Sequence, residues 1–205
     1  MKKNTKPLFP EKLYHIYNRG INGENLFRQE RNYQYFLSKY RKFLSPVAEL
    51  YTYCLLKNHF HFLIEVRREE EIIKYFVEKN PQLKSPSPDQ LISKAFNSFF
   101  KSYSVTINRT YDRTGRLFEE PFLRIEINSS SQITNLIKYI HLNPQKHGFV
   151  QDFQSYAHSS FHILKSVDPT WLAKEKVMDW FGGVDEFISI HEDASVLAGS
   201  HLDLD

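Results

Sequence analysis

Residues 47–66 contain two apolar runs, VAELYTYCLL and HFHFLIEV, which are separated only by the polar pair Lys57-Asn58. Each run has the length of a strand and is rich in β-branched and aromatic residues, and so short a polar connection is typical of a β-hairpin. We therefore predict two adjacent antiparallel strands over 47–56 and 59–66. Such a pair needs other elements to cover its apolar face, which constrains the rest of the fold.

Two further segments have strand character. KLYHIYN (12–18) alternates apolar and polar residues. The segment 117–127 predicts another strand, interrupted near Pro121 because proline cannot donate to a sheet. The predicted helices do not alternate strictly with these strands. The pattern therefore favours an α+β fold, in which helices pack on an antiparallel sheet.

Apolar residues at helical spacing predict the helices. The first helix is predicted from Tyr33 to Leu44 and the second over 70–79. A third has an apolar stripe from Ile92 to Tyr103 with Asp89 as its cap. A fourth begins at a cap in SSSQ (129–132) and is closed by Pro144 and Gly148, and two short helical pieces follow it. The segment 80–90 is rich in Pro and Ser and is expected to be a flexible surface connection.

Composition excludes several classes of protein. The wholly apolar runs are far shorter than the roughly 20 residues that a membrane-spanning helix needs, so no membrane partner is expected. The start, MKKNTKPLFP, has basic residues without the apolar stretch of a secretory signal. Cys54 is the only cysteine, which rules out an internal disulfide and argues against a cysteine-based zinc site. These features predict a soluble cytoplasmic protein.

Charge is distributed unevenly along the chain. The 27 Lys and Arg against 24 Asp and Glu give a net charge of +3. Residues 185–205 hold six of the acids and no Lys or Arg, so the first 184 residues carry +9. A basic body with an acidic tail suits a polyanionic ligand such as nucleic acid, although an ordinary solvated surface is the alternative.

The strand 59–66 carries the first candidate site. Side chains alternate along a strand, so His59 and His61 face one way while Phe60 and Phe62 face the other as part of a core. Two imidazoles two residues apart on one strand face can both reach a single metal ion. Taken alone, a His-X-His pattern on a half-exposed strand usually has no function, and that alternative stays open.

The second candidate site is KYIHLNP, residues 138–144. Tyr139 and Asn143 are four residues apart, which stacks them one turn from each other on a helix face. A phenol and a carboxamide in that register could bring a nucleophile and an oxygen ligand to one point. The alternative is that Tyr139 packs at the margin of the core and Asn143 caps the helix before Pro144.

Together the two motifs suit nucleophilic attack on a phosphodiester. The ligand types of His59, His61 and Asn143 suit Mg²⁺ or Mn²⁺, which would polarise a phosphate oxygen and stabilise charge on the leaving 3′ oxygen. Tyr139 would attack in line and become bonded to phosphorus. The phosphotyrosine would keep the energy of the broken bond, so a 3′-hydroxyl could later rejoin the strand without ATP. A free tyrosine has a pKa of about 10, so the site must assist its deprotonation.

These motifs stand in a sequence that resembles the REP-associated tyrosine transposases, a branch of the IS200-like single-tyrosine HUH transposases that process single-stranded DNA. The resemblance covers most of the chain in order, and it weakens in the last of its segments. Those segments are YHIYNRGINGENLFRQERNYQYFL (14–37), KNHFHFLIEV (57–66), NRTYDRTGRLFEEPFLRIEI (108–127), YIHLNPQKHGFV (139–150) and YAHSSF (156–161).

The resemblance implies a role for each motif residue. His59-Phe60-His61 matches the HUH element, Tyr139 the nucleophile and Asn143 the third metal ligand. Lys57 stands where the family usually has proline, and the run 145–147 (QKH) differs from the small or basic pair that is often found there. Neither departure removes a catalytic group.

The resemblance also implies a fold and an activity. The fold is a ferredoxin-like antiparallel sheet with helices on one face, the HUH pair on a central strand and the tyrosine on a nearby helix. The activity is metal-dependent DNA transposition: endonucleolytic cutting of one strand near hairpin-forming REP repeat DNA with flanking guide tetranucleotides, through a 5′-phosphotyrosine. The family works as monomers or homodimers, and both remain possible for this chain.

Basic residues suggest where DNA would bind, with an ordinary solvated face as the alternative. The candidates are Arg19, Lys57, Lys94, Lys101, Arg109, Arg113 and Arg116, with Lys2, Lys3 and Lys6 near the start.

The chain is expected to divide into a basic N-terminal tail (1–12), a catalytic domain (13–150), a C-terminal helical extension (151–192) and an acidic tail (193–205). A catalytically silent protein that binds structured single strands, and a metallohydrolase with water as nucleophile, are the competing functions.

Overall fold

The structure is a computed structural model of the 205-residue chain, and it describes residues 6–84 and 86–197. Four strands form one sheet in the order β2-β3-β1-β4, and every neighbouring pair is antiparallel. The strands are β1 (Leu13–Arg19), β2 (Ala48–Leu56), β3 (His59–Val66) and β4 (Leu123–Ile127). The predicted hairpin over 47–66 is therefore confirmed as β2 and β3.

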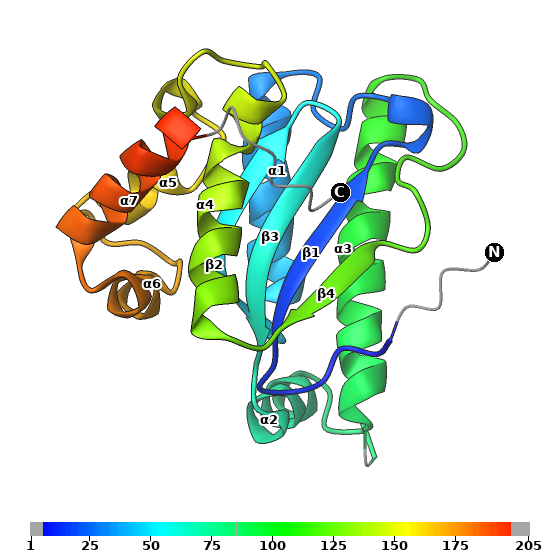
Figure 1. The fold of residues 1–205 in the computed structure, drawn as a ribbon. Coiled ribbons are helices and arrows are strands. Elements are labelled where there is room, and N and C mark those ends of the chain that lie inside the picture. Colours follow the sequence, from blue (N-terminus) through cyan, green and yellow to red (C-terminus); the bar gives the residue numbers. More distant parts are fainter. Residues whose placement is uncertain (1–5, 85, 198–205) are drawn as a thin grey trace.

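Helices connect and follow the strands (Figure 1). They are α1 (Glu30–Lys39), α2 (Glu69–Lys79), α3 (Pro88–Thr110), α4 (Ser130–Lys146), α5 (Phe161–Lys165), α6 (Lys174–Phe181) and α7 (Val184–Leu197). Two short 3-10 helices, η1 (Ile21–Gly23) and η3 (Phe153–Ser155), and a π-helix, η2 (Tyr40–Leu44), which directly follows α1, complete the set. The order of strands and helices up to β4 is that of a ferredoxin-like fold. The predicted α+β class is confirmed.

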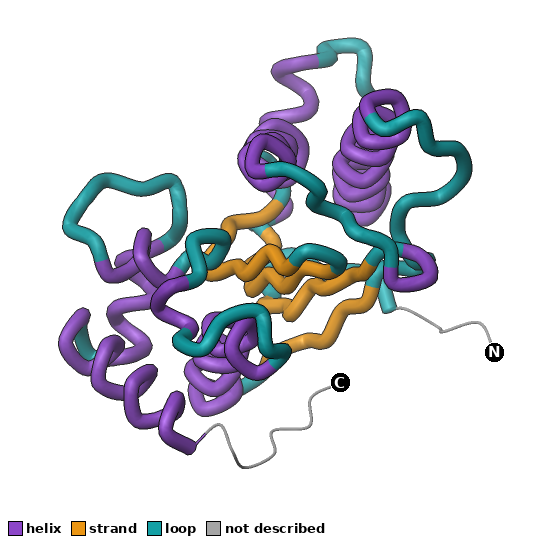
Figure 2. Tube along the Cα trace, turned by 90° about the horizontal axis from the view of Figure 1, so that it is seen from above, coloured by secondary structure: helices purple, strands orange, loops and turns teal. Residues whose placement is uncertain are grey.

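One face of the sheet is covered by α1 and α3 (Figure 2). Phe36 of α1 lies between the two layers, with its ring centroid 5.1 Å from that of Phe60 on β3 and 4.8 Å from that of Phe99 on α3. All three side chains are buried. The predicted apolar face of the strand 59–66 is thus the face that packs on these helices.

The other face is covered by α4, which packs on β2 and β3 and carries α5, α6 and α7 on its outer side (Figure 1). The expectation of helices on one face only is wrong for this chain. The reason lies in α4 itself, whose buried stripe of Ile133, Leu136, Ile137 and Ile140 needs an apolar surface, and the first face is already filled. The part of the sheet formed by β2 and β3 thus lies between two helical layers.

Of the two predicted ends of α4, the N-terminal one is confirmed and the C-terminal one lies later in the chain than expected. Ser129 is the N-cap and its hydroxyl accepts a hydrogen bond from the Gln132 N–H (3.3 Å), as predicted. At the other end the helix continues through Pro144 to Lys146, and the prediction that Pro144 closes it is wrong. A proline so near a C-terminus removes only the bond to the carbonyl four residues earlier, so the last turn survives. Gly148 then turns the chain with a positive φ of 70°.

Three other boundaries differ from the sequence pattern. α3 begins at Pro88 with Ser87 as N-cap, so Asp89 lies in the first turn rather than at the cap. β4 begins only at Leu123, after the cis bond between Glu120 and Pro121, which is where the interruption was expected. Residue 193, where the acidic tail was predicted to begin, lies within α7, and residues 198–205 and 1–5 are outside the described part.

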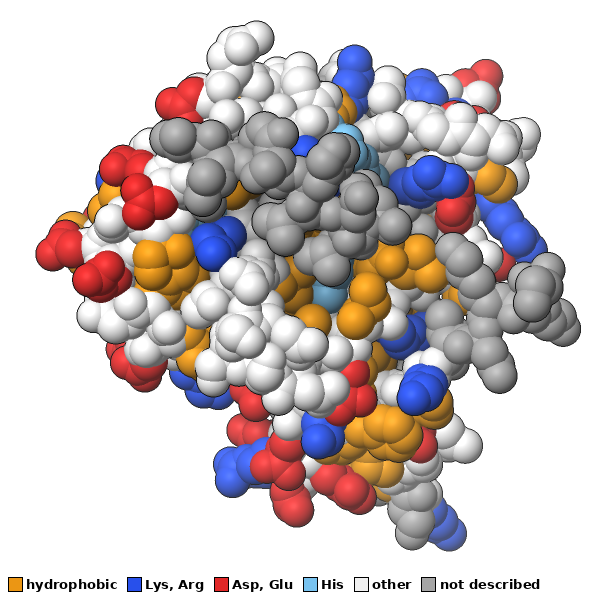
Figure 3. Space-filling model, viewed as in Figure 1, with side chains coloured by type: hydrophobic (Ala, Val, Ile, Leu, Met, Phe, Trp, Pro, Cys, Tyr) orange, Lys and Arg blue, Asp and Glu red, His pale blue; other side chains and the backbone are white. Residues whose placement is uncertain are grey.

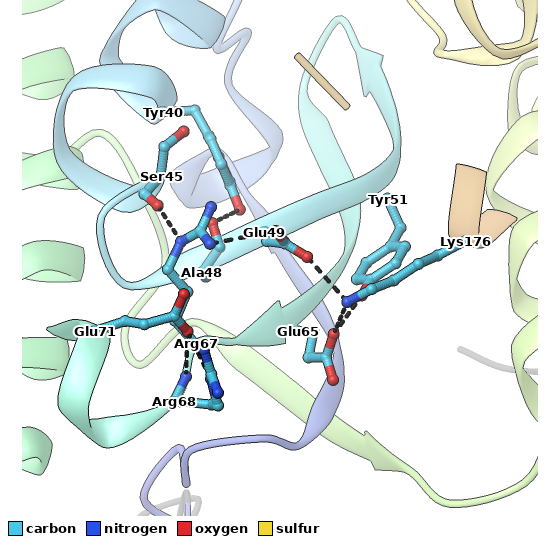
Figure 4. Close-up of polar contacts among 10 residues, drawn as sticks. All are labelled: Tyr40, Ser45, Ala48, Glu49, Tyr51, Glu65, Arg67, Arg68, Glu71 and Lys176. Atoms are coloured by element: carbon cyan, nitrogen blue, oxygen red, sulfur yellow. Dashed lines mark hydrogen bonds and ion pairs between the residues drawn. The ribbon is translucent and has the colours of Figure 1, made fainter. Parts of the chain in front are cut away.

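The C-terminal extension is fastened to the sheet by polar contacts (Figure 4). The Lys176 ammonium of α6 donates to Glu49 (3.2 Å), Glu65 (3.0 Å) and the Tyr51 hydroxyl (3.0 Å), all on β2 and β3. Beside them Arg67 donates to the Ser45 carbonyl (2.7 Å). The extension therefore packs as a part of the same body as the sheet. Among the described residues, no helix is both long and apolar enough to cross a bilayer.

Candidate active site

β1 and β3 place three histidines on one face of the sheet. In the register between these strands Tyr17 lies opposite His61 and Arg19 opposite His59, and residues two apart on a strand share a face. His15 of β1 therefore joins His59 and His61. The ring centroid of His61 is 5.2 Å from that of His59 and 5.2 Å from that of His15. The third imidazole was not expected from the sequence.

α4 brings the other two predicted residues to this face. The ring of Tyr139 stands edge-on to that of His61, with centroids 5.5 Å apart. One turn later, Asn143 Oδ1 lies 3.4 Å from His59 Nε2. Asn143 is not the helix cap, because the helix runs to Lys146 and His147 is its C-cap. One chain thus assembles all four residues of the predicted site.

Hydrogen bonds fix which nitrogen of His59 faces Asn143. The Nδ1 atom of His59 lies 2.8 Å from Asn58 Oδ1, and because an amide oxygen only accepts, Nδ1 carries the proton. In the neutral ring Nε2 then has a lone pair, and it faces the lone pairs of Asn143 Oδ1. Two acceptors that face each other repel, whereas a cation shared between them would be bound by both.

The buried amide of Asn143 is a second observation that favours a cation between His59 and Asn143. It is fully buried, and its Nδ2 atom has no hydrogen-bond partner among the described residues. Turning the amide over would give Nδ2 an acceptor in His59 Nε2, yet it is the oxygen that faces the histidine. Buried polar groups are nearly always paired, so an exception needs a cause. An oxygen directed at a cation site is such a cause, and the donor set fits a divalent ion.

His61 has the protonation state that a metal ligand needs. Burial, followed by the neighbouring His15, His59 and His147, lowers its pKa well below the usual value, so the ring is neutral at pH 7. Metal ions bind neutral imidazole. In the described ranges no group of three or more His, Cys, Asp or Glu residues is placed to hold a metal ion, so a cation beside His59 and His61 would need a ligand of another type there, such as the Asn143 oxygen.

Three of the four predicted site residues are buried in this structure, and His59 is half-buried. Tyr139 exposes 3% of its surface, His61 3% and Asn143 none. A phosphodiester must approach the phenolic oxygen along the axis of attack, which needs open space on that side. Attack by Tyr139 on a phosphodiester would therefore require its phenolic oxygen to become accessible.

Two basic residues after Asn143 also border the site. Lys146 Nζ lies 5.3 Å from the ring centroid of Tyr139, and the ring of His147 lies 5.2 Å from that of His59. Lys146 follows Tyr139 by seven residues, which is two helical turns, so its position could have been predicted. His147 could not, because the helix was expected to have ended before it.

The predicted DNA-binding residues fall into three groups, of which two are exposed on opposite faces of the sheet. Arg19 and Lys57 are exposed and adjoin the site, Arg19 as the strand partner of His59 and Lys57 in the turn before it. Arg19 also pairs with Glu119 at 2.6 Å. Lys101 and Arg109 are exposed on α3, the helix on the opposite face of the sheet. The space-filling view of the site face shows basic side chains dispersed among acidic ones rather than gathered in one patch (Figure 3).

The remaining two arginines hold the loop that precedes β4. Arg113 is largely buried, donates to Asn108 and forms an ion pair with Glu24, which ties the loop 111–118 to the glycine loop that follows β1. The exposed Arg116 lies 3.3 Å from Glu120. The Arg113 guanidinium is thus already used within the protein.

The comparisons with known proteins can be set against this geometry. No family model matches the chain. It is 26% identical to the "Putative REP-associated tyrosine transposase" of Haemophilus influenzae over 142 residues, which are 65% of this chain and 75% of that protein. A solved structure of a REP-associated tyrosine transposase bound to a REP hairpin matches with a TM-score of 0.55 and 15% identity, covering 80% of this chain and 84% of the other. The chain resembles REP-associated tyrosine transposases.

One match is in sequence and the other is in fold. The likeness in sequence to a REP-associated tyrosine transposase agrees with the family that the motifs suggested. The likeness in structure bears on the fold, since it holds at only 15% identity. The structural match agrees with the antiparallel sheet and packed helices described above.

Proposed function

We propose that this protein is a metal-dependent single-stranded DNA endonuclease and strand transferase that cleaves beside hairpin repeat DNA through a 5′-phosphotyrosine intermediate. The proposal rests chiefly on one observation. A tyrosine ring lies against His61 while, one helical turn on, an amide oxygen faces the lone pair of His59 across 3.4 Å. The solved relative bound to a REP hairpin suggests the type of DNA.

Each residue has a separate task in the proposed reaction. The Tyr139 oxygen attacks the phosphorus, the bond from phosphorus to the 3′ oxygen breaks, and that oxygen leaves as a 3′-hydroxyl after taking up a proton. His59, His61 and Asn143 would hold Mg²⁺ or Mn²⁺, which supplies electrophilic stabilisation of the charged phosphate when bound. The Lys146 ammonium adds positive charge beside the phenol ring. The reverse attack by a 3′-hydroxyl on the phosphotyrosine rejoins DNA and frees the tyrosine.

DNA would enter where the two exposed basic residues adjoin the site. Arg19 and Lys57 flank His59 and would contact the phosphates next to the scissile bond. Because Arg19 pairs with Glu119, a phosphate must displace that carboxylate. The pair is exposed, so its loss costs about 1 kcal/mol or less. Lys101, Arg109 and Arg116 would serve parts of a hairpin that lie further from the site.

An adduct assay tests the proposal. Hairpin oligonucleotides with single-stranded flanks and a 3′-end label are incubated with the protein and Mn²⁺, and denaturing gels reveal labelled DNA that migrates with the protein. We expect the wild type to form this adduct and Tyr139→Phe to lose it. Tyr75→Phe, on α2 and away from the site, is the matched control and should retain it. An adduct that persists in Tyr139→Phe would show that another residue is the nucleophile.

The same assay separates the competing functions. Cleavage without an adduct, unaffected by Tyr139→Phe, would indicate a hydrolase that uses water. Hairpin binding without cleavage by the wild type, over a panel of hairpins and with both Mg²⁺ and Mn²⁺, would indicate a silent binding protein. His59→Ala should abolish cleavage but leave hairpin binding largely intact, because it removes a ligand and no phosphate contact.

A further inference from the structure

His15 makes a direct hydrogen bond to one of the proposed metal ligands. Its Nε2 atom lies 2.9 Å from Nδ1 of His61, and both side chains are buried. His15 comes from β1, so the contact joins neighbouring strands of the sheet. No part of the proposed reaction uses His15, and the sequence pattern gave it no role.

The direction of this hydrogen bond decides what His61 can do. If His15 Nε2–H donates, the neutral His61 ring carries its own proton on Nε2 and has no lone pair left for a metal. If His61 Nδ1–H donates to a lone pair on His15, then His61 Nε2 is free of a proton. A metal-ligating histidine normally donates its other N–H to a fixed acceptor, which sets both its tautomer and its orientation.

The neighbouring ligand already shows the second arrangement. His59 donates from Nδ1 to Asn58 Oδ1 at 2.8 Å and turns Nε2 toward Asn143. An acceptor on Nδ1 of each ligand would leave both Nε2 atoms available. His15 occupies for His61 the place that Asn58 occupies for His59.

We propose that His15 is a positioning residue that accepts the Nδ1–H of His61 and thereby fixes His61 as an Nε2 metal ligand. This inference rests on the proposed function in one respect, namely that His61 binds a metal ion. The surroundings hold His15 in place for the task, since it is buried on a strand between β3 and β4 and its ring meets the edge of Tyr139 at 6.2 Å. A buried acceptor on a central strand has little freedom to turn away.

The first test reads the tautomer in the metal-free protein without DNA. Long-range ¹H–¹⁵N NMR distinguishes a protonated from an unprotonated imidazole nitrogen for each histidine. We expect His61 to carry its proton on Nδ1 in the wild type and to lose that preference in His15→Phe, which keeps a ring but removes the acceptor. His59 should remain protonated on Nδ1 in both proteins. A wild-type His61 with its proton on Nε2 would overturn the proposal.

The second test measures Mn²⁺ binding to the free chain by calorimetry. We expect His15→Phe to bind Mn²⁺ roughly 10- to 100-fold more weakly, which is the usual effect of losing such a partner. His15→Gln places an amide oxygen near the former Nε2 position and should restore most of the affinity. Tyr17→Leu, which removes the ring stacked on His15 but leaves the hydrogen bond, is the control for local repacking and should bind nearly as wild type.

The outcomes separate this inference from the proposed function. Equal affinity in His15→Phe and wild type, or a loss in Tyr17→Leu as large as in His15→Phe, would show that the hydrogen bond has no positioning role. The NMR result needs neither DNA nor metal. If the tautomer behaves as expected while the wild type forms no DNA adduct, the positioning role stands and the proposed function fails.

Discussion

The buried histidine of α7 allows a quantitative prediction about stability and pH. His191 is fully buried, its Nδ1–H donates to the Phe187 carbonyl, and its Nε2 lies 2.9 Å from Nδ1 of His141. The carbonyl can only accept, so the neutral His191 ring must accept from His141. Burial, assisted by Lys138, lowers the pKa of His191 to about 4, against the opposing effect of the Phe187 bond.

The sign of the effect follows from where the proton binds. Between about pH 6.5 and 4 the unfolded chain protonates this histidine and the folded chain does not, so stability falls as pH falls through that range. A depression from 6.5 to about 4 corresponds to roughly 3 kcal/mol once pH is below both values. Between pH 7 and pH 5 the expected loss from this one group is about 2 kcal/mol.

Urea unfolding followed by tryptophan fluorescence measures this loss of stability, because both tryptophans, Trp171 and Trp180, lie in the C-terminal extension. With a slope of about 2 kcal/mol per M urea, the wild-type midpoint should fall by about 1 M more between pH 7 and 5 than that of His191→Leu. The variant should be less stable than wild type at pH 7, since it leaves the His141 N–H without an acceptor.

The matched control is Phe181→Leu, a truncation beside His191 on α6 with the ring centroids 5.6 Å apart. It should lower stability by a similar amount at both pH values, because it removes no titratable group. If His191→Leu loses as much stability between pH 7 and 5 as the wild type, the reasoning about its buried neutral state is refuted.

Three other predictions concern the site and its surroundings. A Cβ atom at Gly20 would lie 1.9 Å from the Glu24 carbonyl oxygen, so Gly20→Ala should cost roughly 2 kcal/mol in urea unfolding, and unchanged stability would contradict the packing described. Arg19→Ala should lower the slope of log Kd for hairpin DNA against log salt by about one, whereas Arg113→Ala should mainly lower the unfolding midpoint; equal salt slopes in Arg19→Ala and wild type would exclude the phosphate contact. Asn143→Ala should weaken Mn²⁺ binding in calorimetry and Asn143→Asp should retain it, and equal affinities in all three proteins would remove Asn143 from the ligand set.

The sequence was enough to locate the elements that carry the site. Strand alternation placed His59 and His61 on one face, and helical spacing placed Tyr139 and Asn143 on another element one turn apart. Both patterns are local, because strands and helices have fixed periods of about 2 and 3.6 residues. The hairpin was predictable for the same reason, since only a two-residue polar pair separates its strands.

The contacts between elements could not be predicted in the same way. His15 reaches His61 because of the register between β1 and β3, which depends on packing far from either residue. The placement of α4 on the second face follows from competition for apolar surface with α1 and α3, which no single segment encodes.

The polar contact between α7 and α4 links the extension to the helix that bears Tyr139 and Asn143. His141 is hydrogen-bonded on one side to His191 and on the other to Thr52 of β2 (2.7 Å) and Ser160 (2.8 Å). A fragment trimmed after residue 150 would keep every motif residue. It would, however, leave an imidazole in the middle of α4 without two of its partners and uncover the outer side of that helix. The smallest stable unit of this protein therefore extends well past the helix that carries Tyr139 and Asn143.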